Sequence, residues 1–95
     1  MPAYVILDVH VTDSERYEDY KKVSGEALAA HGGRFLVRGG QAEKLEGDWN
    51  PARIVVLEFD SMEQAKRWYD SDEYRGPKAI RQAASEGRMI LVDGM

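Results

Sequence analysis

The order of the periodic segments is the feature that most constrains this fold. Four short segments in which apolar residues alternate or cluster are typical of β-strands: residues 3–11, 34–40, 53–59 and 88–93. Between them, two stretches show the three- and four-residue spacing of helices: residues 13–31 and 61–85. This order predicts a ferredoxin-like βαββαβ fold, α+β with an antiparallel sheet and an extra helix before the last strand.

The boundaries of the first helix follow from its flanking residues. Thr12 and Glu15 have the spacing of a capping box, so the helix is expected to begin at about Asp13. Gly32 supplies the left-handed residue that ends a helix. The expected buried stripe of this first helix consists of Tyr17, Tyr20, Val23 or Ser24, Ala27 and Leu28. Residues 41–52 are expected to hold a short strand or ribbon and a turn.

The second helical region has two start signals. Ser61 and Gln64 form another possible capping box, followed by an expected buried side of Met62, Ala65, Trp68 and Tyr69. Ser71 then occupies the position of an N-cap for the next helix. Because proline lacks a backbone N–H, Gly76-Pro77 predicts a kink or a new helix start.

Composition narrows the classes of function. The 95 residues predict one domain spanning 1–95, and the net charge of −4 argues against nucleic-acid binding. The longest apolar run is too short for a membrane span, and no basic leader precedes the first strand. No cysteine is present, which excludes disulfides and thiolate chemistry. These features predict a cytoplasmic protein with no membrane partner.

Strand alternation predicts two unlike sheet faces. One face is apolar and is expected under the helices. The other face mixes aliphatic and charged side chains, expected to be Ile6, Leu36, Ile54 and Val56 with Asp8, His10, Arg38 and Glu58. A monomer seldom exposes so many aliphatic residues together. We therefore expect a two-fold homodimer in which the open sheet faces pack together.

Three segments resemble the domain of unknown function 1330 family: "HGGRFLVRGG", "LEGDWNPARIVVLEFDS" and "YDSDEYRGPKAIRQAASEGRMILVDG". The similarity covers nearly the whole chain, although Pro77 departs from the family pattern. It implies a dimeric α+β barrel but no particular activity. That superfamily also contains cofactor-independent monooxygenases, muconolactone isomerase-like proteins and haem-handling members. The matching positions are Gly32, Gly33, Glu46, Gly47, Trp49, Glu58, Phe59, Ser71, Tyr74 and Arg81.

His10 is the main candidate for catalysis. Imidazole exchanges protons near neutral pH, and Asp8 lies two residues away on the same strand face, where it would orient the ring. The alternative is a solvated polar residue near a strand end. With only His10 and His31 and no metal-binding spacing, we expect no metal site and no cofactor.

Five other side chains are candidate ligand contacts. Glu58 and Arg38 are expected on the open face, where they bind a ligand or simply neutralise each other across the interface. Trp49 follows a turn glycine and would close the rim of a pocket or pack on a partner subunit. Tyr74 lies seven residues before Arg81, so both share one helix side. Arg81 would then grip a carboxylate of the protein or of a ligand.

Two classes of function fit these candidates. The first is a protein that binds a small organic molecule, anionic if the arginines hold it, in the barrel or between sheet and helices. Such a protein could also be a cofactor-independent enzyme that uses acid–base chemistry at His10. The alternative is a non-catalytic dimeric binding or scaffold protein. The sequence does not identify the ligand, the reaction or the pathway, because both classes need the same kind of cavity.

Overall fold

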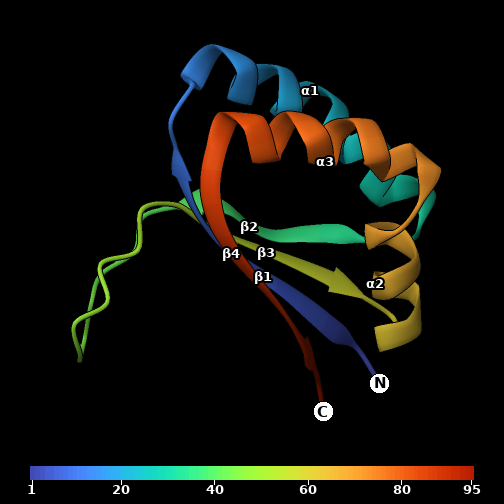
Figure 1. Cartoon of the computed structure of the whole chain (residues 1–95). Helices are drawn as coiled ribbons and strands as arrows, with labels where there is room; N and C mark the ends of the chain where they lie inside the picture. The colour runs from blue at the N-terminus through green and yellow to red at the C-terminus, as the bar shows by residue number, and fades with distance from the viewer.

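In the computed structural model, which describes residues 1–95, three helices cover one face of a four-stranded antiparallel sheet (Figure 1). The elements are β1 (Ala3–Val11), α1 (Ser14–Ala30), β2 (Arg34–Gly40), β3 (Ile54–Phe59), α2 (Met62–Tyr69), α3 (Asp72–Ala84) and β4 (Ser85–Asp93). The strand order β2-β3-β1-β4 is that of a split βαβ fold. The prediction of a ferredoxin-like α+β fold is confirmed. No helix is both long enough and apolar enough to cross a membrane.

The central strand β1 separates the two faces of the sheet as its alternation predicts. Val5, Leu7 and Val9 are at most 4% exposed and face the helices. Asp8 and His10 belong to the opposite face, which no helix covers. We call this uncovered surface the open face. The largest side chains that are fully buried in the core are those of Trp68, Tyr74, Phe59 and Val9.

Helix α1 starts one residue later than its capping box suggests. Asp13, and not Thr12, is the N-cap, and its carboxylate accepts a hydrogen bond from the backbone N–H of Arg16. Thr12 still donates its backbone N–H to the carbonyl of Ala84, so its main chain is occupied by that contact. Gly32 has φ +72° at the end of the helix, as predicted.

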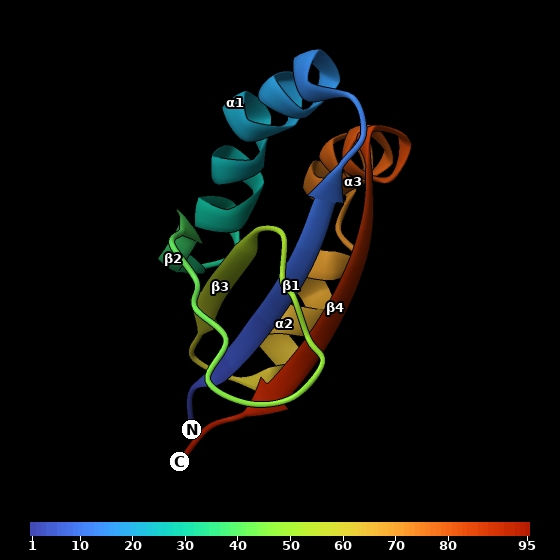
Figure 2. The same cartoon turned by 90° about the vertical axis from the view of Figure 1, so that its left-hand side faces the viewer.

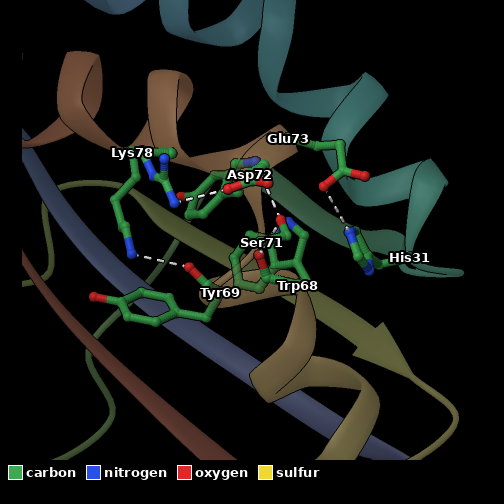
Figure 3. A network of polar contacts seen from close by, with 9 residues as sticks. His31, Trp68, Tyr69, Ser71, Asp72, Glu73 and Lys78 are labelled. Atoms are coloured by element: carbon green, nitrogen blue, oxygen red, sulfur yellow. Dashed lines mark hydrogen bonds and ion pairs between the residues drawn. The ribbon is translucent and has the colours of Figure 1, made fainter.

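The start of α3 is fixed by Ser71, as its position in the sequence predicts. The Ser71 hydroxyl accepts from the backbone N–H of Tyr74 at 3.1 Å and donates to the carbonyl of Trp68 at 2.7 Å (Figure 3). Ser61 caps α2, because its hydroxyl accepts from the backbone N–H of Gln64. The side chain of Gln64, however, donates to the carbonyl of His31 and thereby ties α2 to the end of α1.

Helix α3 is continuous through Pro77, so the expected new helix start at Gly76-Pro77 is wrong. Pro77 lies just beyond the first turn, where it removes a single hydrogen bond. Tyr74 and Arg81 are buried on either side of it, and their packing stabilises the helix across the proline. The helix leads directly into β4 at Ser85, three residues before the expected strand start at residue 88.

The segment between β2 and β3 contains no strand, contrary to expectation. Residues 41–53 form an extended loop that leaves the end of the sheet on the side away from the helices (Figure 1). Within this loop, Leu45 is 93% exposed and Trp49 is 54% exposed. The loop therefore presents two large apolar side chains to solvent beside the open face.

Candidate functional site

Asp8 anchors the long loop to the open face. Its two carboxylate oxygens accept hydrogen bonds from the indole N–H of Trp49 at 2.8 Å and from the backbone N–H of Ala52 at 3.2 Å. No hydrogen bond joins Asp8 to His10. The structure thus brings Asp8 and Trp49 together, whereas the orientation of His10 by Asp8 remains a hypothesis from the sequence.

His10 is exposed in a groove beside this anchor. The groove has a volume of about 660 Å³ and is open to solvent. Residues of β1, β4 and the long loop line it, among them Ile6, Asp8, His10, Trp49, Arg88 and Ile90. Three or more metal-binding side chains do not gather there or elsewhere in the protein.

Glu58 pairs with Arg34 on the open face, and not with Arg38. The guanidinium Nε of Arg34 donates to Oε1 of Glu58 at 2.6 Å, and the two residues are register partners on β2 and β3. Nearby, burial followed by the Glu58 carboxylate raises the pKa of the Tyr4 phenol above its usual value. The Glu58 carboxylate is therefore paired within the chain.

The expected placement of Arg38 on the open face is wrong, because β2 contains a bulge. Phe35 pairs with Leu57 but Val37 pairs with Val56, so Leu36 is an extra residue. One extra residue reverses the alternation that follows it, and Arg38 turns to the helix side. There its guanidinium lies 4.3 Å from the centre of the Phe35 ring and donates to the carbonyl of Lys21 on α1 at 2.8 Å.

Arg38 belongs instead to a second cavity, between the helices and the sheet, which we call the inner cavity. Its enclosed volume is about 20 Å³, enough for one oxygen-sized group. Apolar side chains form most of the wall, and all the charged residues that line it are cationic, namely Lys21, Arg38 and Arg53. The nearby Glu18 forms an ion pair with Lys21 at 2.9 Å.

Two hydrogen-bond donors of the residues that line this cavity have no partner in the protein. They are the indole Nε1 of Trp68, whose side chain is 2% exposed, and Nε of Arg53. A buried donor without an acceptor costs about 1–3 kcal/mol. Arg53 also lies 5.7 Å from the centre of the Tyr17 ring and packs against Gly39.

Sequence reasoning missed Arg53 and treated Trp68 only as a core residue. A signal for Arg53 exists, since Arg53 directly precedes β3 and continues the alternation of Val55 and Leu57. This spacing places a cation on the apolar face. No comparable signal exists for the unpartnered indole of Trp68, because its surroundings come from distant parts of the chain.

Tyr74 and Arg81 lie together in the interior, as their spacing predicts. Nε of Arg81 is 3.2 Å from the hydroxyl oxygen of Tyr74, which in turn is 2.9 Å from that of Tyr20 on α1. Arg81 is 6% exposed and forms no ion pair. Burial alone would lower the pKa of Arg81, but the neighbouring hydroxyls of Tyr74, Tyr20 and Tyr69 together outweigh it, and the pKa lies above the usual value.

Solved structures with the same fold come from proteins of very different kinds. A protein of unknown function from Rhodopseudomonas palustris has a TM-score of 0.80 and 21% identity, covering 99% of this chain and 82% of that chain. SnoaB, a cofactor-independent oxygenase from Streptomyces nogalater, has a TM-score of 0.61 and 12% identity, covering 99% and 91%. The de novo designed protein Foldit4 has a TM-score of 0.64 and 15% identity, covering both chains completely.

These likenesses establish the fold and no activity, since the same architecture serves an oxygenase and a designed protein. A search of curated protein sequences finds no match to this chain. The family comparison is more direct, because the family described as a domain of unknown function, DUF1330, matches residues 2–95. The chain therefore belongs to the DUF1330 family and has a ferredoxin-like α+β fold.

Proposed function

We propose that this protein is a homodimer that binds a small organic anion in the inner cavity. The observation that carries the proposal is a pair of buried donors without partners, Arg53 Nε and Trp68 Nε1, on two residues that line the same cavity. A ligand oxygen that accepts from them removes the cost of leaving them unpaired.

The charges at the cavity favour an anion over a water molecule as the occupant. Lys21, Arg38 and Arg53 contribute positive charge, and no acidic residue lines the cavity. The enclosed volume admits one oxygen-sized group. One oxygen of the ligand's anionic group therefore enters the cavity, and the rest of the ligand lies outside it, near the cationic side chains. The bridge from Arg38 to the carbonyl of Lys21 closes the space between β2 and α1, so its release would admit the ligand.

The homodimer follows from the apolar side chains on the open face. Ile90 is 57% exposed, Leu36 51% and Val92 40%, although each lies in a strand of the sheet. Charges of both signs share this face, including Asp8 and Arg88, so two copies related by a two-fold axis can pair them. Burying these side chains against a second copy would favour association by several kcal/mol at ~25 cal/mol per Å².

Thermal unfolding tests the binding function. Sodium propionate and benzoate, compared with propionamide and benzamide at equal ionic strength, are expected to raise Tm by roughly 5–10 °C at ten times Kd. The variants Trp68→Phe and Arg53→Met should lose most of this rise. Arg67→Met, an exposed change on α2, should retain it. No difference between carboxylates and amides would refute the proposal.

A second candidate is acid–base catalysis by His10 in the open-face groove, because its imidazole lines a space large enough for an organic substrate. NMR would follow a set of small organic acids and phenols incubated with the protein and with His10→Gln. Conversion by the parent that His10→Gln abolishes would support this role. Conversion that the variant retains, or no conversion at all, would leave binding as the function.

A further inference from the structure

A chain of three buried polar side chains leads from the interior of the helical layer to the inner cavity. It runs from Arg81 to Tyr74 on α3 and then to Tyr20 on α1, through contacts of 3.2 and 2.9 Å. Tyr20 is 8% exposed and also lines the cavity. The cavity end of this chain is therefore Tyr20.

The chemistry of these groups favours one direction for their protons. A guanidinium has donors and no acceptor, so Arg81 donates to the oxygen of Tyr74. The hydroxyl proton of Tyr74 has a single acceptor in the protein, the oxygen of Tyr20. Either hydroxyl can donate in this contact, but the hydrogen bond from Arg81 makes Tyr74 the stronger donor. The favoured arrangement has Tyr20 accepting from Tyr74, which leaves the Tyr20 proton without an acceptor in the protein.

We infer that Arg81, acting through Tyr74, holds Tyr20 as a hydrogen-bond donor toward the inner cavity, which thereby selects a deprotonated oxyanion. The ligand class is a carboxylate, enolate or phenolate. A protonated ligand group has a hydrogen to donate, but the cavity wall offers it mainly other donors. This inference rests on the proposed function and specifies its ligand. Arg81 is a positioning residue, and Tyr20 is the residue that contacts the ligand.

The composition of the cavity wall supports this selection. With Tyr20 oriented in this way, three donors with no protein acceptor border the cavity: Tyr20, Arg53 and Trp68. No Asp, Glu, Asn, Gln or His lines it. The remaining hydroxyls, of Tyr17 and Ser24, can rotate to donate or accept.

The burial of the chain is consistent with a positioning role. Desolvation, followed by the nearby Tyr74, raises the pKa of the Tyr20 phenol far above its usual value, so Tyr20 keeps the proton that it donates. Arg81 is a buried cation without an acidic partner, and an apolar residue of similar size would avoid its desolvation cost. A purely structural role therefore does not explain why an arginine occupies this position.

The ratio of the Kd of propan-1-ol to that of propionate measures the selection. We expect Arg81→Met and Tyr20→Phe each to lower this ratio roughly tenfold or more, since each removes the oriented donor. Arg81→Lys, which keeps a cationic donor, should restore it to within about threefold. Arg75→Met, at an exposed arginine of the same helix, is the matched control. An unchanged ratio in both Arg81→Met and Tyr20→Phe would overturn the inference.

Neutron diffraction of the parent protein gives a second readout that needs no variant. The expected deuteron lies on Tyr74 and points to Tyr20, and the Tyr20 deuteron points away from Tyr74. Propionate binding together with a Tyr20 deuteron directed at Tyr74 would overturn the inference alone. Failure of the parent to bind propionate and benzoate would overturn the proposed function, and with it the selection of a ligand.

Discussion

The indole N–H of Trp49 donates to Asp8 Oδ2 across 2.8 Å, and this contact joins the long loop to the central strand of the sheet. The second oxygen of Asp8 accepts from the backbone of Ala52 in the same loop. In Figure 2 residues 41–53 lie in front of the open face, where this anchor holds them. One carboxylate on β1 thus determines where the loop stands.

Replacing this carboxylate should release the loop. Asp8→Asn keeps the size of the side chain but leaves only one acceptor oxygen, a loss of about 1 kcal/mol. Trypsin should then cleave after the exposed Lys44 roughly fivefold faster, because the form in which the loop is detached from the sheet is more populated. Asp48→Asn, the same change at a loop residue whose side chain forms no hydrogen bond, is the control. Equal cleavage rates in the two variants would show that Asp8 is no anchor.

A charge on the open face should weaken the proposed dimer. Ile90→Asp places a carboxylate in an interface where the change occurs twice, so we expect association to weaken roughly a hundredfold. Val23→Asp on α1 alters a residue that is also exposed, at 38%, but lies on the helical side, and should have no effect. Sedimentation equilibrium measures both. A parent protein that is monomeric at micromolar concentration would contradict the homodimer.

Two glycine substitutions should change stability in opposite directions. Gly39 has φ +74°, and a Cβ there would meet the guanidinium of Arg53, so Gly39→Ala should destabilise the fold by about 1–2 kcal/mol. Gly25 lies inside α1, and a Cβ added there would meet no atom within 4 Å, so Gly25→Ala should stabilise by about 0.5–1 kcal/mol. Urea denaturation compares the two. Equal effects of the two substitutions would contradict the inference that the positive φ of Gly39 and its close contact with Arg53 exclude a side chain there.

Acid stability should depend on Glu73 at the start of α3 (Figure 3). Its backbone N–H and then His31, 3.3 Å away, lower the pKa of the Glu73 carboxyl. The folded state therefore binds this proton more weakly than the unfolded state. The stabilisation is complete above the ordinary pKa of 4.5 and is lost as pH falls through the lowered value.

Glu73→Gln should accordingly flatten the fall in stability between about pH 5 and pH 3, as measured by urea denaturation. The variant should be less stable than the parent at pH 7, and the difference should shrink as the pH falls. Glu63→Gln on α2 makes the same change of charge at another exposed helix residue. If Glu63→Gln alters the fall in stability at low pH as much as Glu73→Gln does, the pairing of Glu73 with His31 is not the cause of that fall.

Most of the fold could be predicted because its signals are local. Alternation in β1 and β3 gave the correct buried faces, and Ser71 could be recognised as a cap from its position alone. The stripe of α1 was also correct, with Ser24 buried and Val23 exposed. Each of these properties depends on residues within one or two turns or strand repeats of one another.

The candidate site was less predictable because it depends on irregular backbone and on distant contacts. Alternation assumes an unbroken strand, so the bulge at Leu36 reversed the expected face of Arg38. Similarly, no local signal shows that Trp68 leaves its indole N–H unpaired or that Asp8 binds Trp49. These facts arise when residues tens of positions apart meet.

The direct passage from α3 into β4 has a consequence for changes in chain length. Ser85 ends the helix and is already paired with Val11, and its hydroxyl donates to the carbonyl of Arg81. An insertion or deletion of one residue at this junction would rotate either Arg81 out of the interior or every later β4 side chain to the wrong face. Residues 41–48, which precede the anchor to Asp8, carry no such constraint on length. Among relatives of this chain, length variation should therefore concentrate in the loop and be absent from the junction.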